Sequence, residues 1–137
     1  MTKIHQVNPE QARKYINSLA LSDEEIWGMD YCLAMSTYIW VGLIDGRLAC
    51  IWGLIPPTLM SNQAYLWLYT TDVIKEHQFI LVRHSQLVME QILEVYPSVC
   101  GHAIVGNDKA IRWLKWLGAK FGEPDRGGLP FRIRRNG

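Results

Sequence analysis

The sequence predicts an α+β fold for one domain over residues 1–137, with a mixed central sheet flanked by helices on both faces. A length of 137 residues fits one ordinary domain, and 49% hydrophobic against 20% charged residues supplies enough material for a core. Capped helical segments alternate with runs of β-branched and aromatic residues. The expected order is β-α-α-β-β-β-α-β-α-β, with room for one more strand at the end.

The first third predicts a short strand and two helices. Residues 4–7 are long enough for the strand. Asn8 and Gln11 have the spacing of a capping box, and Ser22 and Glu25 repeat it, so a helix should begin after each cap. The apolar residues expected to face inward are Ala12, Tyr15, Ile16 and Leu19 in the first helix and Ile26, Met29 and Leu33 in the second.

The middle of the chain predicts three strands in a meander. Residues 38–44 and 48–55 are rich in β-branched and aromatic residues, and Asp45-Gly46 between them is a strong hairpin signal. Residues 64–70 carry bulky side chains at successive positions, which is typical of a central strand covered on both faces.

The last part predicts a long helix over residues 75–96, with a buried stripe of Leu81, Ser85, Val88, Ile92 and Val95. The elements expected after it are a strand over 99–105, a helix capped by Asn107-Asp108 that ends at Leu117 and Gly118, and closing strands at Phe121 and 131–134.

Charge is unevenly distributed along the chain. The net charge of +1 disfavours a general nucleic-acid binder. Residues 109–137 nevertheless hold eight Lys or Arg and two acidic residues, a net of +6, whereas the other residues hold six and eleven, a net of −5. The C-terminal third therefore predicts a positive end, although a solvated surface with a basic tail explains the same pattern.

Cysteine usage and hydropathy indicate the compartment. Cys32, Cys50 and Cys100 are far apart and form no CxxC pair, so buried thiols in a reducing compartment are favoured over disulfides or a metal site. The polar N-terminus and the interrupted apolar stretches predict neither a signal peptide nor a membrane span. We expect an intracellular protein or one carried inside a particle.

Two segments carry a resemblance to the GNAT superfamily of N-acetyltransferases. The segment from Gly106 to Ala119 reads Gly-Asn-Asp-Lys-Ala-Ile-Arg-Trp-Leu-Lys-Trp-Leu-Gly-Ala and is similar to the family's N-x-x-A-I-R-x-Y-x-K-x-G-F helix. Residues 66–71, followed by a long helix, are similar to the family's fourth strand and third helix. With its small size, the chain also resembles the degenerate GNAT-like proteins of short-tailed bacteriophages, some of which are carried in the virion.

The resemblance implies acetyl-CoA or CoA as cosubstrate and transfer of an acetyl group to an amine. Strands 66–71 and 99–105 would separate, and the pantetheine arm would pair with backbone groups in the gap. The pyrophosphate would lie on the amides that open the long helix. The cofactor-binding residues implied are Leu68, Thr70, Lys75, His77, Asn107 and Arg112.

The chain departs from the family pattern at two places. Glu76, Gln78 and Ile80 occupy the glycine positions of the pyrophosphate loop. Leu114 stands where the family has the tyrosine that protonates the leaving thiolate. The substitutes available are Tyr65, Tyr69, Cys100 and His102, of which Tyr69 and His102 are our catalytic candidates. Core packing for the tyrosines and an ordinary strand position for the histidine are the structural alternatives.

Two functions therefore stay open. One is a phage-type acetyltransferase that acts on an amine of a protein or small molecule. The other is a catalytically degenerate GNAT fold that serves as a virion component or binds a host enzyme, in the host cytoplasm or inside a virion. The basic residues Arg132 and Arg134, with Lys109, Arg112 and Lys115, suit the 3′-phosphate of CoA, an acidic protein surface or RNA. Trp113 and Trp116 lie three apart, so an exposed one would mark an interface with a host target or a second copy of the chain.

Overall fold

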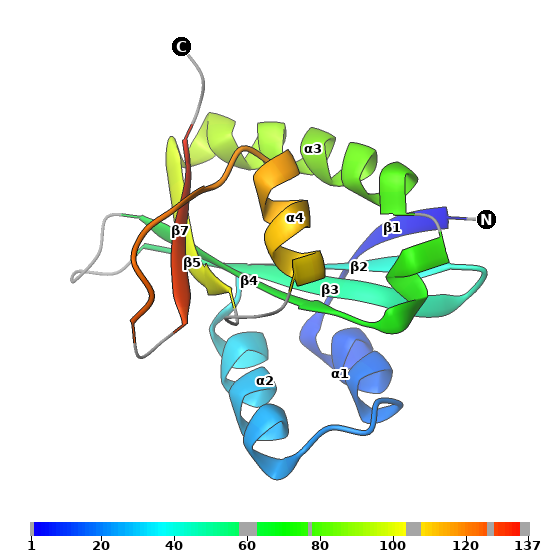
Figure 1. Ribbon diagram of the computed structural model, residues 1–137. Coiled ribbons are helices and arrows are strands. Elements are labelled where there is room, and N and C mark those ends of the chain that lie inside the picture. Colours follow the sequence, from blue (N-terminus) through cyan, green and yellow to red (C-terminus); the bar gives the residue numbers. More distant parts are fainter. Residues whose placement is uncertain (1, 58–62, 77, 104–107, 126–127, 135–137) are drawn as a thin grey trace.

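The computed structural model describes residues 2–57, 63–76, 78–103, 108–125 and 128–134, with the side chains of residues 75, 76 and 78 left outside this description. The elements in chain order are β1 (Thr2–Val7), α1 (Pro9–Asn17), α2 (Asp23–Met35), β2 (Tyr38–Ile44), β3 (Arg47–Ile55), β4 (Ala64–Thr70), the 3₁₀ helix η1 (Asp72–Glu76), α3 (Gln78–Val95), β5 (Ser98–Ala103), α4 (Asp108–Trp116), β6 (Lys120–Phe121) and β7 (Leu129–Arg134). The predicted α+β order is confirmed (Figure 1).

The described strands form one mixed sheet in the order β1-β2-β3-β4-β5-β7-β6. Neighbouring strands pair antiparallel throughout, except for the central pair β4 and β5, which run parallel. The β4–β5 connection contains η1 and α3, because parallel strands need a long crossover.

Helices cover both faces of the sheet. In Figure 1, α3 and α4 lie on one side of it and α1 and α2 on the other. The core under α3 and α4 contains Trp52, Leu66, Leu81, Trp113 and Phe131 among its buried residues. The second core lies under α1 and α2, and its strand residues point to the opposite face of the sheet. It includes Ala12, Leu33, Ile51 and Trp67. The expectation of a central strand covered on both sides is confirmed, because β4 contributes to both cores.

The local signals in the first half are confirmed in detail. Both capping boxes form, at Asn8 with Gln11 and at Ser22 with Glu25. Asp45 and Gly46 both have positive φ, at 50° and 79°, as the tight turn between β2 and β3 requires.

Three expectations about element bounds and faces need correction. The long helix begins at Gln78 and not at Lys75, because η1 comes first. Val95 is 69% exposed, since the buried row of α3 shifts onto Met89 and Ile92. Ile26 is 41% exposed, because the first turn of α2 lies away from the sheet (Figure 1). The predicted strand positions 104–105 and the cap Asn107 lie outside the described residues.

Candidate active site

The two parallel strands in the middle of the sheet separate after a short stretch of pairing. Ala64 and Tyr65 of β4 pair with Val99 and Cys100 of β5. Within the described parts of the two strands, no later residue of β4 has a partner in β5, although β4 continues to Thr70. Ladder pairing between β4 and β5 therefore ends at the Tyr65–Cys100 pair, and the resemblance implies that the two strands separate beyond it.

The backbone of β4 directs hydrogen-bonding groups into this gap. In an antiparallel ladder, alternate residues point their N–H and C=O groups toward the neighbouring strand. The Thr71 N–H donates to the Ala49 carbonyl at 2.9 Å, so the residues in alternation with Thr71 face β3. The intervening Leu66, Leu68 and Thr70 therefore face β5. Leu68 and Thr70, both predicted as cofactor-binding residues, lie beyond the last paired position.

A glycine lies at the point where the strands separate. A Cβ at Gly101 would collide with the Leu66 carbonyl oxygen and come within 2.7 Å of the Phe131 ring. Only glycine permits β5 to approach β4 this closely.

Three polar side chains form a chain on the α1/α2 face beside the start of the gap. The Tyr65 hydroxyl lies 3.3 Å from His102 Nδ1, and His102 Nε2 lies 3.4 Å from Asp125 Oδ2. Partial burial, and then the neighbouring Cys32 and Cys100 thiols, raise the pKa of Tyr65. Tyr65 is therefore a neutral hydroxyl at neutral pH, next to an imidazole that can exchange a proton with it.

Tyr69 lies on the same face of β4 as Tyr65 and Trp67, two residues beyond Trp67. Burial raises the pKa of Tyr69, and the carboxylates of Glu25 and Asp72 add to this effect because they oppose a second negative charge. The Tyr69 hydroxyl is thus protonated at neutral pH and suits an acid better than a base.

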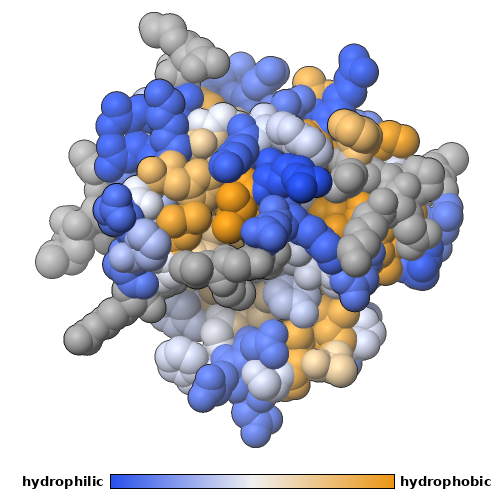
Figure 2. Space-filling view, viewed as in Figure 1, coloured by the Kyte–Doolittle hydropathy of each residue, from blue (hydrophilic) through white to orange (hydrophobic). Residues whose placement is uncertain are grey.

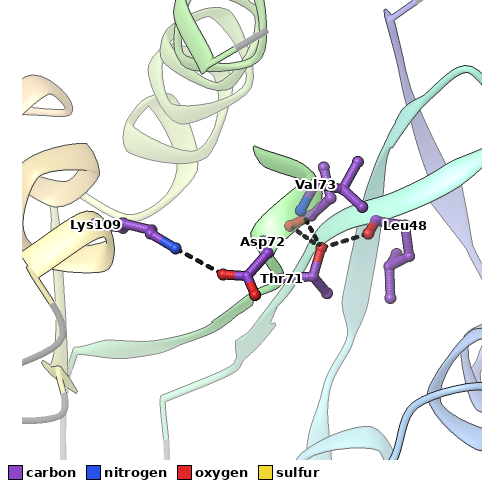
Figure 3. Close-up of polar contacts among 6 residues, drawn as sticks. Leu48, Thr71, Asp72, Val73 and Lys109 are labelled. Carbon is purple, nitrogen blue, oxygen red and sulfur yellow. Dashed lines mark hydrogen bonds and ion pairs between the residues drawn. The ribbon is translucent and has the colours of Figure 1, made fainter. Parts of the chain in front are cut away.

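The end of β4 is tied to its neighbours by side chains (Figure 3). Thr71 Oγ1 donates to the Leu48 carbonyl at 2.6 Å and accepts from the Val73 N–H at 3.3 Å. The next residue, Asp72, accepts a hydrogen bond of 2.8 Å from Lys109 Nζ in the first turn of α4. This ion pair joins the end of β4 to α4, which follows β5 in the chain.

The space between β4 and α4 is packed. Trp113 is 3% exposed and its ring contacts Trp52 on β3, with centroids 6.1 Å apart. Leu114, at the position of the family's tyrosine, is 1% exposed. The cavity left between these side chains and β4 measures about 10 Å³, which is room for about one water molecule and not for a ligand.

The structure brings Tyr65 and His102 together and places Tyr69 on the same face, whereas Arg112 lies exposed on α4. Of the other residues that we predicted to bind the cofactor, His77 and Asn107 and the side chain of Lys75 lie outside the described part of the chain. Sequence reasoning missed Asp125. No motif marks a single aspartate in a turn-rich segment, and only folding brings it to His102.

The two basic groups do not form one surface. Phe131 and Ile133 face the α3/α4 core, so Arg132 and Arg134 point to the opposite face of the sheet. The basic residues of α4 lie on the α3/α4 side. Our expectation that the two groups act together is wrong, because the sheet lies between them.

The described residues hold no group of three or more potential metal ligands and no helix with the length and hydropathy of a membrane span. Trp116 is 37% exposed and stacks on Phe79, which is 75% exposed. Figure 2 shows apolar surface in this region, where α3 begins at the upper right.

Comparisons with known proteins identify the fold. No protein-family model matches the sequence, and no curated protein matches it. Solved structures of GNAT-family acetyltransferases match along nearly the whole chain. A GNAT acetyltransferase from Staphylococcus aureus Mu50 has a TM-score of 0.70 at 9% identity, over 98% of this chain and 99% of that one.

Two further neighbours carry more specific names. The PaiA N-acetyltransferase from Thermoplasma acidophilum, in complex with coenzyme A, has a TM-score of 0.65 at 13% identity, over 98% and 99% of the two chains. An aminoglycoside N(6′)-acetyltransferase from Legionella pneumophila has a TM-score of 0.59 at 14% identity, over 97% and 91%. The chain thus has the fold of GNAT acetyltransferases.

Proposed function

We propose that this protein transfers the acetyl group of acetyl-CoA to an amine. The observation that carries the proposal is the end of ladder pairing between β4 and β5 at the Tyr65–Cys100 pair, although β4 continues to Thr70. The pantetheine arm has amides at its middle, and the backbone groups of Leu68 and Thr70 that face the gap match them. Acetyl-CoA supplies the acetyl group as an activated thioester.

The chain's own residues supply the proton transfers. An acceptor amine at neutral pH is mostly charged and needs a base before it can attack. In one tautomer, the Tyr65 hydroxyl donates to His102 Nδ1 while the Nε2–H donates to Asp125. The amine proton can then pass to the Tyr65 oxygen as the Tyr65 proton passes to Nδ1, and Asp125 stabilises the imidazolium. Tyr69, whose raised pKa keeps it protonated, would return a proton to the departing thiolate.

The residues placed to bind the phosphates of CoA fit this role less well than those placed to bind the pantetheine arm. The 3₁₀ helix η1 precedes α3, and Ile80 near the start of α3 occupies one of the family's glycine positions. Asp72 adds a negative charge at the end of β4, and its partner Lys109 is the cation that would otherwise be directed to a phosphate. We therefore expect weaker binding of CoA than a glycine-rich loop would give.

A second candidate function is the phage-type one without catalysis, in which the fold is a virion component or binds a host enzyme. Buried Leu114 in place of a tyrosine favours it. So do Trp27 and Tyr31 on α2, which are 74% and 55% exposed and stack with ring centroids 6.4 Å apart. Location in the host cytoplasm or in a virion belongs to the same prediction.

Calorimetric titration and thermal unfolding with acetyl-CoA and CoA separate the two candidates. Ligand at a hundred times its Kd should stabilise the protein by about 2.7 kcal/mol. No binding at millimolar acetyl-CoA would refute the acetyltransferase proposal and leave the second candidate.

The Asp72–Lys109 pair allows a more specific test by the same titration. We expect Asp72→Asn to tighten acetyl-CoA binding by about threefold to tenfold, because it removes a negative charge from the end of β4 and weakens the ion pair with Lys109. Asp30→Asn is the matched control, since it breaks the similar Arg13–Asp30 pair of 2.6 Å between α1 and α2. Equal affinities in both variants would contradict the placement of the phosphates near Asp72.

Acetylation assays test the proton chain. We expect His102→Ala and Tyr65→Phe, which remove the base and its relay, to lower kcat by about 10²–10⁴-fold, and Asp125→Asn to lower it by less. His5→Ala, which changes an exposed histidine on β1, should leave the rate unchanged. Unchanged kcat in His102→Ala would exclude the imidazole as the base.

A further inference from the structure

A cavity of about 630 Å³ lies on the face of β5, β7 and β6 that neither α1 nor α2 covers. The residues that line it include Cys100, His102, Lys120, Phe121, Arg132 and Arg134. Its volume is that of a small-molecule site and exceeds what a flat protein contact would form.

Cross-strand pairing arranges the lining side chains in rows. Cys100 lies opposite Arg132, and Arg132 lies opposite Lys120. His102 lies opposite Pro130 in the next row on the same face. Two residues of a strand separate the rows, which is about 7 Å. The imidazole of the proposed base is therefore one row away from the Arg132–Lys120 pair.

The cationic side chains of this cavity lie next to one another, and no carboxylate of the described residues neutralises their charges. Arg132 and Lys120 are direct cross-strand neighbours, and like charges in that position destabilise a sheet. Among the residues that the structure describes, no carboxylate forms an ion pair with Lys120, Arg132 or Arg134. A bound anion would remove the repulsion and form charge-assisted hydrogen bonds with these side chains.

The other end of the cavity has the opposite character. His102 lines this end, and the Asp125 carboxylate, which does not itself line the cavity, lies 3.4 Å from His102 Nε2. An ammonium group is attracted to this end and an anionic group to the other.

We propose that this cavity binds the acceptor, and that the acceptor is a small amine that also carries a phosphate or carboxylate group. The amine lies at the end where His102 and its partner Tyr65 meet, and the anionic group lies between Arg132 and Lys120, one row or about 7 Å away. This inference rests on the proposed acetyl transfer for its use, but the anion site itself does not depend on acetyl-CoA.

Titration with four small probes tests the cavity without acetyl-CoA. O-phosphoethanolamine carries both groups, ethanolamine only the amine, and inorganic phosphate only the anion; β-alanine replaces the phosphate by a carboxylate. We expect O-phosphoethanolamine or β-alanine to bind at least tenfold more tightly than ethanolamine at low salt, with the difference shrinking as salt rises. The better of the two identifies the anion. Equal affinity for ethanolamine and both anionic amines would overturn the proposal.

Variants locate the binding. The double variant Arg132→Gln/Lys120→Gln should weaken binding of the preferred anionic amine at least tenfold. Lys3→Gln, which removes an exposed cation from β1 at the far edge of the sheet, should leave it unchanged. Unchanged affinity in the double variant would also overturn the proposal. The double variant should unfold at wild-type or higher denaturant concentration, because it relieves the Arg132–Lys120 repulsion.

The two proposals fail in different ways. A protein that binds the anionic amine but no acetyl-CoA retains the cavity's ligand and refutes acetyl transfer. A protein that acetylates ethanolamine as efficiently as the anionic amines retains acetyl transfer and refutes the acceptor class.

Discussion

The close approach of β5 to β4 at Gly101, where the two strands stop pairing, can be tested by a single substitution. Gly101→Ala adds one methyl group where the Leu66 carbonyl oxygen and the Phe131 ring already lie. The ring can move, but the carbonyl belongs to a strand that is hydrogen-bonded to β3 on its other side. Overpacking of a core costs about 1–3 kcal/mol, and a backbone contact favours the upper end of that range. We expect a loss of about 3 kcal/mol in the free energy of unfolding.

Urea unfolding followed by circular dichroism measures this loss. With an m-value of about 2 kcal/mol/M, the midpoint should fall by roughly 1.5 M. Gly28→Ala is the matched control, because a Cβ at this position in α2 meets nothing within 4 Å. The same methyl group should there stabilise the protein by about 0.5–1 kcal/mol, through helix propensity. A Gly101→Ala midpoint within 0.25 M of wild type, about 0.5 kcal/mol, would refute the close approach of the two strands.

Two other changes have equally definite outcomes. Trp113→Ala should lower the free energy of unfolding by about 3–5 kcal/mol, because it empties a buried site against Trp52. Trp116→Ala should lower it by about 1 kcal/mol or less. Equal losses in urea unfolding would contradict the assigned faces of α4. Burial raises the pKa of Cys50 far above its usual value of 9.0, so the unfolded chain releases this proton first as pH rises. With the other two cysteines replaced by serine, stability should fall above pH 9 by up to about 1.4 kcal/mol per pH unit, and Cys50→Ala should remove most of that slope below pH 10, where Tyr65 and Tyr69 begin to contribute.

Local chemistry in the sequence was sufficient for most elements of the fold. The capping boxes at Asn8 and Ser22 and the Asp45-Gly46 turn depend on residues three or fewer positions apart, so no distant contact is needed to predict them. The run of bulky residues at successive positions of β4 likewise indicated a strand covered on both faces.

The prediction of helix faces was less accurate where the helix meets the sheet at an angle. Ile26 and Val95 continue an apolar period, but Ile26 lies in the first turn of α2, away from the sheet, and the buried row of α3 passes through Met89 and Ile92 instead of Val95. Periodicity describes a helix surface and does not say how far its partner reaches.

The candidate site shows most clearly what the sequence determined about this protein. His102 and Tyr69 could be selected from residue type and from their place on strands expected to separate. Asp125 could not, because a turn between β6 and β7 brings it to His102 across 23 residues of sequence.

Only the tertiary structure decided the charge distribution around that site. The excess of basic residues after position 109 was readable from the sequence, but the sheet divides it between two faces. Strand pairing then sets Arg132 against Lys120 beside an open cavity. Register and layer are properties of long-range packing, and a list of charges along the chain contains neither.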